Sequence, residues 1–159
     1  VPFATVGGTA AGYGRGEILR PARLDRPFRA LLVVPRWRVS TARAFARIDR
    51  RKNRLTLWKA NLRCAEVLER ERIRVEGAVR LGNTFETVLG NRREDFNSIC
   101  KRLQGAGAIA VRMTGSGSAV FGVLDSSLGA REAAASYEGS EALYLVSSSR
   151  RGLQLIRQP

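Results

Sequence analysis

Residues 112–121 read Arg-Met-Thr-Gly-Ser-Gly-Ser-Ala-Val-Phe, and this stretch decides how the rest of the sequence is interpreted. The segments on either side of its centre, Ala108–Met113 and Ala119–Leu124, are short and apolar, which is typical of β-strands. Thr114–Ser118 between them is rich in glycine and serine. The stretch therefore predicts a strand, a tight loop and a second strand.

The loop also has the composition of a phosphate-binding site. Gly115 and Gly117 allow backbone conformations that are closed to other residues, so successive peptide N–H groups can converge on an anion. The hydroxyl groups of Thr114, Ser116 and Ser118 add further donors. These five residues are the candidate phosphate-binding residues. The alternative is an ordinary hairpin turn, and a Walker A loop is excluded because no Gly-Lys-Ser/Thr follows.

Outward from this loop, the sequence predicts an α+β fold. The predicted strands are 9–11, 17–19, 28–34, 108–113, 119–124 and 142–147, and the predicted helices are 41–48, 55–74, 78–89, 93–105 and 127–137. From residue 28 onward the order strand–helices–strand–loop–strand–helix–strand fits a ferredoxin-like split β-α-β sandwich. A short glycine-rich segment precedes it.

Side-chain placement follows from the same periodicity. Phe96, Ile99 and Leu103 recur at helical spacing and should share one buried helix face. The predicted core positions on strands include the aromatic residues Phe28, Phe121 and Tyr144. We therefore expect a single apolar core with few aromatic side chains exposed on the sheet.

The composition excludes several kinds of chemistry. A chain of 159 residues is long enough for about one domain with its own core. It contains no histidine, which removes Ser–His and Cys–His catalysis and nearly every zinc arrangement. No metal site and no catalytic residue is predicted within this chain.

The net charge of +14 is almost all arginine, because the lysines are only Lys52, Lys59 and Lys101. A solvated arginine-rich surface, an anionic substrate and a nucleic acid would each account for it. The charge is scattered from Arg15 to Arg157 rather than clustered. We therefore do not expect nucleic acid to be the main partner.

The sequence also indicates a compartment. Cys64 and Cys100 are far apart and in no C-x-x-C pair, so each is interpreted as a small buried side chain in a reducing environment. The first residues have no signal-peptide pattern, and no apolar run is long enough to span a membrane. A cytoplasmic protein without a membrane partner is expected.

Several stretches, in the same order along the chain, resemble the GHMP kinases, and among them the diphosphocytidyl-methylerythritol kinases. Residues 112–121 resemble the third conserved motif of the superfamily. The stretches that select the narrower family are Val1-Pro-Phe3, Gly7-Gly-Thr-Ala10, Gly14-Arg-Gly-Glu17, Val39-Ser-Thr-Ala42 with Phe45, and Asn83-Thr-Phe-Glu86. Thr84 departs from the acidic residue that the family usually has there. The resemblance covers nearly the whole chain.

The resemblance implies roles for particular residues. The loop Thr114–Ser118 would lie beside the phosphates at the transfer site. Gly7 and Gly8 would let the substrate pass close to the backbone, and Phe45 would stack on the cytosine ring. The alternative for Phe45 is a core position on an amphipathic helix, together with Ala42 and Ala46.

It also implies a division of the chain. Residues 1–24 would be a remnant of the amino-terminal kinase domain, and residues 25–159 the GHMP kinase C-terminal domain. The family's catalytic aspartate would directly precede Val1, and its amino-terminal ATP-binding motifs have no counterpart here. We therefore expect this chain alone to be inactive, with the amino-terminal half as its missing partner.

The complete enzyme implied by the resemblance uses ATP and magnesium. It would phosphorylate the 2-hydroxyl of a cytidine diphosphate substrate, 4-diphosphocytidyl-2-C-methyl-D-erythritol, in non-mevalonate isoprenoid biosynthesis. Three alternatives stay open: another GHMP kinase of the homoserine or mevalonate type, a basic nucleic-acid-binding α/β module, and a degenerate regulatory partner without catalysis.

Overall fold

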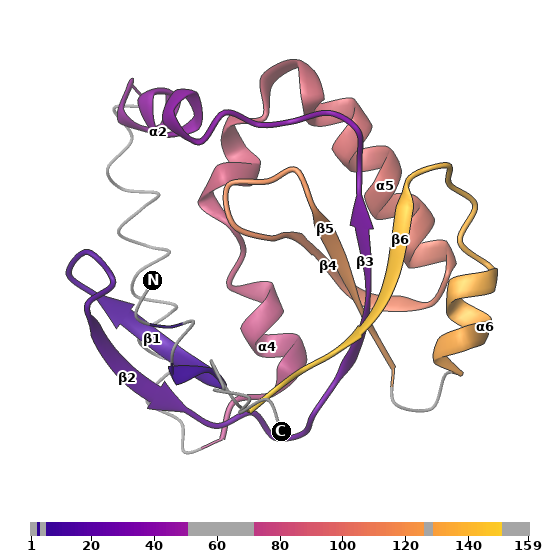
Figure 1. The fold of residues 1–159 in the computed structure, drawn as a ribbon, viewed down its shortest axis with the longest axis horizontal. Coiled ribbons are helices and arrows are strands. Elements are labelled where there is room, and N and C mark those ends of the chain that lie inside the picture. Colours follow the sequence, from indigo (N-terminus) through magenta and orange to yellow (C-terminus); the bar gives the residue numbers. More distant parts are fainter. Residues whose placement is uncertain (1–2, 4–5, 51–71, 126–128, 151–159) are drawn as a thin grey trace, which may run out of the picture.

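The computed structural model describes residue 3 and residues 6–50, 72–125 and 129–150 (Figure 1). A four-stranded sheet organises most of them. Its strands are β3 (Arg29–Val34), β4 (Ala108–Met113), β5 (Val120–Leu124) and β6 (Ala142–Ser147). They lie in the order β4-β5-β3-β6, and every neighbouring pair is antiparallel.

The connections between these strands make the domain ferredoxin-like. Helices separate β3 from β4, a tight loop joins β4 to β5, and one helix separates β5 from β6. This order, with the first strand between the third and the fourth, is the split β-α-β arrangement. The α+β fold predicted from the sequence is confirmed.

Two helices cover one face of the sheet. Helix α5 (Arg93–Gly105) packs against β4 and β5, and helix α6 (Ala130–Ala135) packs against β3 and β6. As predicted, Phe96, Ile99 and Leu103 of α5 are all buried. The same core contains the following strand residues: Leu31, Val33, Val111, Met113, Val120 and Leu124.

Local chemistry explains where these elements begin and end. Pro35 follows β3 directly and has no N–H group to continue the ladder. Helix α5 has Glu94 and Asp95 in its first turn and Arg102 in its last, an arrangement that the helix dipole favours.

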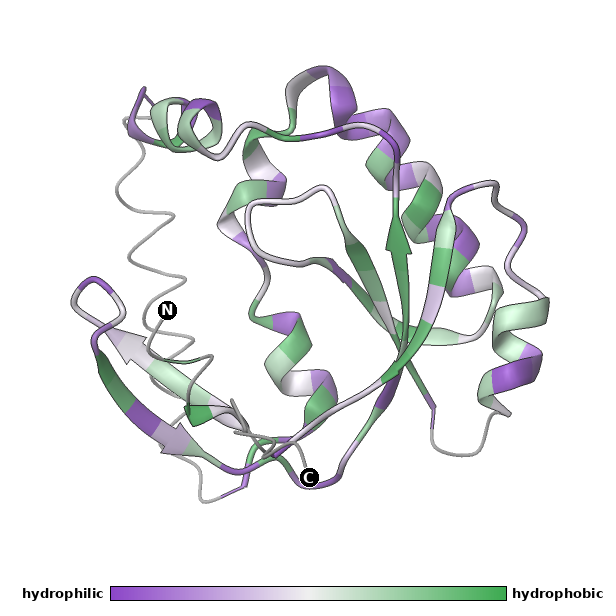
Figure 2. Ribbon diagram, viewed as in Figure 1, coloured by the Kyte–Doolittle hydropathy of each residue, from purple (hydrophilic) through white to green (hydrophobic). Residues whose placement is uncertain are grey.

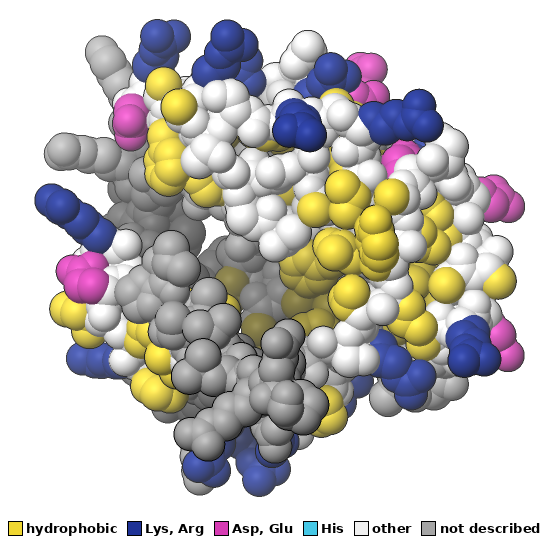
Figure 3. All heavy atoms as spheres, viewed as in Figure 1, with side chains coloured by type: hydrophobic (Ala, Val, Ile, Leu, Met, Phe, Trp, Pro, Cys, Tyr) yellow, Lys and Arg dark blue, Asp and Glu magenta, His cyan; other side chains and the backbone are white. Residues whose placement is uncertain are grey.

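The opposite face of the sheet is only partly covered. Ala30 and Val123 are paired neighbours on this face and are buried, but Val34 and Tyr144 are 39% and 54% exposed. Figure 3 shows hydrophobic side chains gathered over the region of the sheet, whereas most strongly hydrophilic residues in Figure 2 lie on helices and turns. The prediction that Tyr144 lies in the core is wrong, because β6 is an edge strand; Phe28 and Phe121 are half-buried.

A separate hairpin precedes the sheet. Strands β1 (Thr9–Tyr13) and β2 (Ile18–Ala22) pair antiparallel, as the glycine-rich sequence predicts. The Gly16 N–H donates to the Tyr13 carbonyl at 3.0 Å, and the Glu17 carboxylate accepts from the Arg15 N–H at 2.5 Å. Glu17 therefore stabilises the turn.

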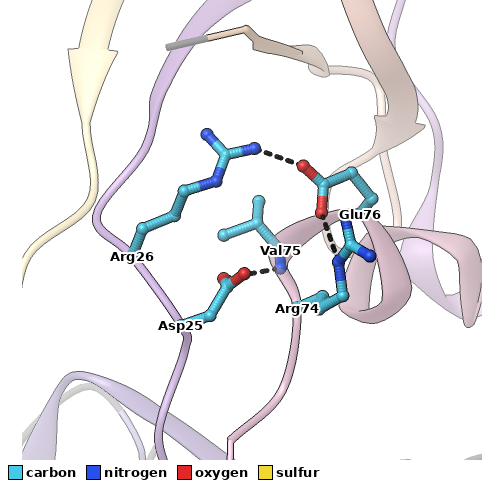
Figure 4. Close-up of polar contacts among 5 residues, drawn as sticks. All are labelled: Asp25, Arg26, Arg74, Val75 and Glu76. Carbon is cyan, nitrogen blue, oxygen red and sulfur yellow. Dashed lines mark hydrogen bonds and ion pairs between the residues drawn. The ribbon is translucent and has the colours of Figure 1, made fainter.

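The chain after the hairpin is joined to the start of helix α4 (Val75–Arg80), as Figure 4 shows. Arg26 and Arg74 both form ion pairs with Glu76. The Asp25 carboxylate accepts from the Val75 N–H at 3.1 Å, and Leu24 and Ile73 form a parallel bridge.

Three helix predictions need correction or qualification. The predicted helix 78–89 is wrong: α4 ends at Arg80, Gly82 adopts a φ of 87°, and two short 3-10 helices follow, η1 (Thr84–Val88) and η2 (Gly90–Arg92). Most of the predicted helix 55–74 lies outside the described residues, but residues 72–74 are not helical. The segment 126–128 before α6 also lies outside them.

Helix α2 (Thr41–Arg50) forms as predicted, but its apolar face does not enter a core. Ala44 is its one buried residue, and Ala42, Phe45 and Ala46 are exposed. The reason is position: α2 packs against η1 rather than against the sheet. Periodicity predicted the helix but not the amount of its face that would be covered.

Candidate phosphate-binding loop and its neighbours

The glycine–serine loop Thr114–Ser118 connects β4 to β5, as predicted. The Thr114 N–H donates to the Ala119 carbonyl at 2.9 Å, and the Gly117 N–H donates to the Thr114 carbonyl at 3.1 Å. Gly117 has a φ of 94°, and a Cβ atom there would lie 2.6 Å from the Met113 sulfur. Glycine is therefore required both by the backbone conformation and by the space available.

The loop is accessible. Thr114 and Gly115 are exposed, and Ser116, Gly117 and Ser118 are half-buried. Within the described part of the chain, the peptide N–H groups of Gly115 and Ser116 have no hydrogen-bond partner. Two main-chain donors and the nearby hydroxyl groups are thus available to an anion.

A neighbouring segment supports the loop from behind. The Asn83 side-chain amide donates to the carbonyls of Met113 and Gly115, each at 2.8 Å. The Glu86 carboxylate accepts from the Met113 N–H at 2.8 Å. The sequence resemblance had singled out residues 83–86, but their contacts with the loop were not predicted. Glu86 therefore binds the main chain at the end of strand β4.

The first residue of helix α2 also contacts the glycine–serine loop. The hydroxyl groups of Thr41 and Ser116 lie 2.7 Å apart. One turn further along α2, Phe45 is 53% exposed, and its ring meets that of Phe85 edge-on, with the centroids 5.0 Å apart. Helix α2 therefore carries both the candidate residue Phe45 and, one turn before it, the Thr41 hydroxyl that contacts the loop. The core position considered for Phe45 is not what the structure shows.

The other candidates lie elsewhere. Gly7 and Gly8 directly precede β1, and the Gly7 N–H donates to the Phe3 carbonyl at 2.8 Å. No hydrogen bond among the described residues joins either glycine to the loop. Figure 1 places the hairpin away from the sheet, and Figure 3 shows a hollow between the two. The loop between β4 and β5 projects toward that hollow.

Among the described residues, neither Arg15 nor Arg112 has a side-chain hydrogen bond to the loop. Arg15 lies in the β1–β2 turn. The Arg112 guanidinium donates to the carbonyl of its neighbour Val111 at 2.9 Å, and its buried Nε atom has no partner in the part of the chain that the structure describes.

Two kinds of site have no support among the described residues. No group of three or more Asp, Glu or Cys side chains there could bind a metal ion. No helix in residues 6–50, 72–125 and 129–150 is long and apolar enough to cross a membrane.

Comparison with known proteins identifies the class. Residues 68–139 match the family model described as GHMP kinases C terminal. This range contains the 83–86 segment, helix α5 and the glycine–serine loop. The chain therefore carries the C-terminal domain of the GHMP kinases, as the resemblance predicted.

The curated relatives are more specific. The chain is 34% identical over 146 residues to the 4-diphosphocytidyl-2-C-methyl-D-erythritol kinase of Pelotomaculum thermopropionicum, covering 92% of this chain and 50% of the relative. The kinase of the same name from Solibacter usitatus is 36% identical over 127 residues, covering 77% and 39%. The chain spans about half the length, or less, of these relatives.

Solved structures agree on the fold. A 4-(cytidine 5'-diphospho)-2C-methyl-D-erythritol kinase superposes with a TM-score of 0.60 at 24% identity, covering 87% of this chain and 48% of that one. The L. major mevalonate kinase in complex with R-mevalonate gives a TM-score of 0.58 at 13% identity, covering 91% and 49%. At these identities the likeness concerns the fold alone.

Proposed function

We propose that this chain is the C-terminal part of an ATP-dependent kinase that phosphorylates the 2-hydroxyl of 4-diphosphocytidyl-2-C-methyl-D-erythritol in non-mevalonate isoprenoid biosynthesis. The names of the curated relatives support this substrate. The observation that carries the proposal is the accessible glycine–serine loop, in which the N–H groups of Gly115 and Ser116 have no hydrogen-bond partner among the described residues.

The loop would act by positioning and by charge stabilisation. Phosphoryl transfer needs little covalent help from the protein, but the oxygen atoms of the transferred group must be neutralised and kept in line. Fixed main-chain donors do this without reorganising during the reaction. Thr114, Gly115, Ser116, Gly117 and Ser118 are the residues to which we assign this role.

The substrate's cytosine would stack on Phe45. An exposed ring offers a flat apolar face to a base, and such stacking contributes about 1–3 kcal/mol. Gly7 and Gly8 would lie beside the diphosphate or the ribose. We also propose that residues 1–24 belong to the amino-terminal kinase domain and residues 25–159 to the C-terminal domain, in a cytoplasmic enzyme.

Magnesium enters only as the companion of ATP. Mg²⁺ is usually bound by one or two carboxylates together with phosphate oxygens. The described residues contain no acidic cluster that fits it. The ion would therefore depend on the nucleotide and on groups outside the described residues, and no role for it is assigned to this chain.

The first test is phosphoryl transfer from labelled ATP to 4-diphosphocytidyl-2-C-methyl-D-erythritol. This chain is assayed alone and then mixed with a matching amino-terminal half. We expect no turnover alone and turnover on mixing. Turnover by the chain alone would show that the catalytic aspartate is dispensable, and no turnover in either sample would contradict the proposed substrate.

A binding experiment tests the assignment of Phe45. Titration of cytidine diphosphate should give an affinity that falls about tenfold or more in Phe45→Ala, since ~1.4 kcal/mol of lost stacking corresponds to tenfold. Thr84→Ala is the matched control, because Thr84 is exposed on the neighbouring 3-10 helix. Equal affinity in all three proteins would remove Phe45 from the site.

A second candidate function is nucleic-acid binding. It is favoured by the charge of +14 and by Tyr144, which is 54% exposed on the sheet where a base could stack. This function predicts oligonucleotide binding that weakens steeply with salt and with Tyr144→Ala. Cytidine diphosphate binding that depends on Phe45 and not on Tyr144 would favour the kinase.

A further inference from the structure

Three hydrogen bonds converge on the junction between β4 and the glycine–serine loop, and all come from two side chains. Asn83 donates from one amide nitrogen to the Met113 and Gly115 carbonyls, and Glu86 accepts from the Met113 N–H. The partners are 27 to 32 residues apart along the chain. The two bonds to Met113 are partly buried, whereas the bond from Asn83 to the Gly115 carbonyl is exposed.

These bonds determine which way the loop's donors point. The Gly115 carbonyl and the Ser116 N–H belong to one planar peptide group and point in opposite directions. Because Asn83 binds that carbonyl, the Ser116 N–H is directed away from Asn83, and it has no partner among the described residues. The bonds to Met113 fix the end of β4 from which the loop starts.

The 3-10 helix η1, which follows Asn83 and contains Glu86, also contacts α2. Phe85 lies between Asn83 and Glu86 in sequence and contacts the ring of Phe45. The Arg47 guanidinium donates to the Val88 carbonyl at 3.1 Å. Among the described residues, these contacts and the Thr41–Ser116 contact connect α2 to η1 and to the loop.

We propose that Asn83 and Glu86 are positioning residues that orient the glycine–serine loop, and that the 3-10 helix η1, which Asn83 caps and which contains Glu86, sets the spacing between this loop and Phe45. Neither residue contacts substrate; each acts through the loop backbone. The role as a spacer between phosphate and base contacts depends on the proposed kinase function. The orientation of the loop does not.

Substitutions of Asn83 and Glu86 can remove or keep their hydrogen bonds to the loop with little change in side-chain size. Asn83→Asp keeps the shape of the side chain but replaces a donor with a carboxylate facing two carbonyl oxygens, which is repulsive. Asn83→Ala removes the donor without adding charge. Glu86→Gln retains an oxygen that can accept from the Met113 N–H, whereas Glu86→Ala does not.

The experiment uses the whole 159-residue chain, labelled with ¹⁵N. In the free protein we expect Asn83→Asp, Asn83→Ala and Glu86→Ala to shift or broaden the amide signals of Gly115 and Ser116. Glu86→Gln and the control Thr84→Ala should leave both signals close to the parent. Unchanged signals in both Asn83 variants would overturn the proposal. If Asn83→Asp does not fold, Asn83→Ala and Glu86→Ala decide the result.

Titration with inorganic pyrophosphate supplies the second readout. We expect the affinity to fall about tenfold or more in the Asn83 variants and in Glu86→Ala, and Glu86→Gln to restore it. The proposal would be overturned if the pyrophosphate affinity of each variant simply fell with the midpoint of its urea unfolding and Glu86→Gln did not restore it. Asn83 and Glu86 would then have a merely structural role. If the parent chain binds no pyrophosphate, the proposed function fails, and the amide signals alone decide whether Asn83 and Glu86 orient the loop.

Discussion

At the scale of single residues, environment determines which side chains can react. Cys100 lies on α5, half-buried and packed against the core. Burial, with the Glu86 carboxylate as a second cause, raises the pKa of the Cys100 thiol to about 11. A thiol with this pKa is protonated at neutral pH, and the thiolate is the reactive form. Cys100 is therefore an unreactive packing residue; the sequence predicted a small buried side chain, and the structure shows it half-buried.

The chemical consequence can be measured. At pH 8 about one Cys100 thiol in a thousand should be ionised, compared with about one in four for an unperturbed cysteine with a pKa of 8.5. In a Cys64→Ser background, Ellman's reagent should modify the folded protein about a hundredfold more slowly than the protein unfolded in urea. Equal modification rates in the folded and unfolded protein would contradict the raised pKa of Cys100. The double variant Cys64→Ser/Cys100→Ser, which has no thiol, gives the background signal.

At the scale of elements, Gly122 lies where α5 and strand β4 pack closely against β5. Gly122 of β5 is buried beneath α5, and a Cβ atom there would lie 2.8 Å from the Ala108 Cβ and 3.3 Å from the Leu103 Cβ. A glycine is needed at this strand position because two neighbouring elements occupy the space, not because of its φ angle.

Adding one methyl group at Gly122 should therefore be costly. Gly122→Ala is expected to lower the free energy of unfolding by about 1–3 kcal/mol through overpacking. Gly105→Ala is the matched control, because a Cβ at the end of α5 meets nothing within 4 Å. That change should be neutral or stabilising by up to about 1 kcal/mol. Urea unfolding measures both, and similar effects of the two changes would refute the packing argument.

At the scale of the whole molecule, a polar junction among the described residues connects the segment after the hairpin to the sheet domain. The segment 23–26 after β2 contacts residues 73–76 before and within α4 through main-chain bonds, the Asp25 contact and the Arg26–Glu76 ion pair (Figure 4). A bond to its own backbone N–H and the guanidinium groups of Arg26 and Arg74 lower the pKa of Glu76, although burial opposes them.

This junction should weaken in acid. The folded-state pKa of Glu76 lies below its ordinary value of 4.5, so its stabilisation is present above that pH. It is lost as the pH falls through the lower folded-state value. In urea unfolding, Glu76→Gln should therefore be less stable than the parent at pH 6, and the difference should shrink toward pH 3. Glu138→Gln, at an exposed position, is the control. A difference that does not change with pH would contradict the role of the ion pair.

Much of the fold follows from local sequence. The alternating and continuous apolar runs at 108–113 and 142–147 predicted β4 and β6 with the bounds that the structure has. The spacing of Phe96, Ile99 and Leu103 predicted the buried face of α5. The loop was recognisable because Gly115 and Gly117 are needed for conformations with φ of 57° and 94°. Each of these features depends on residues close together in the chain.

The remaining features were decided by the tertiary structure. The candidate phosphate-binding loop could be located from sequence, but its support by Asn83 and Glu86 could not, because the partners are 27 to 32 residues apart. Tyr144 and Phe45 have apolar character that favours a core, yet they lie on an edge strand and on a helix outside the sheet. Periodicity determines which side of an element is apolar; what covers that side depends on contacts between distant segments, and only the folded chain establishes those.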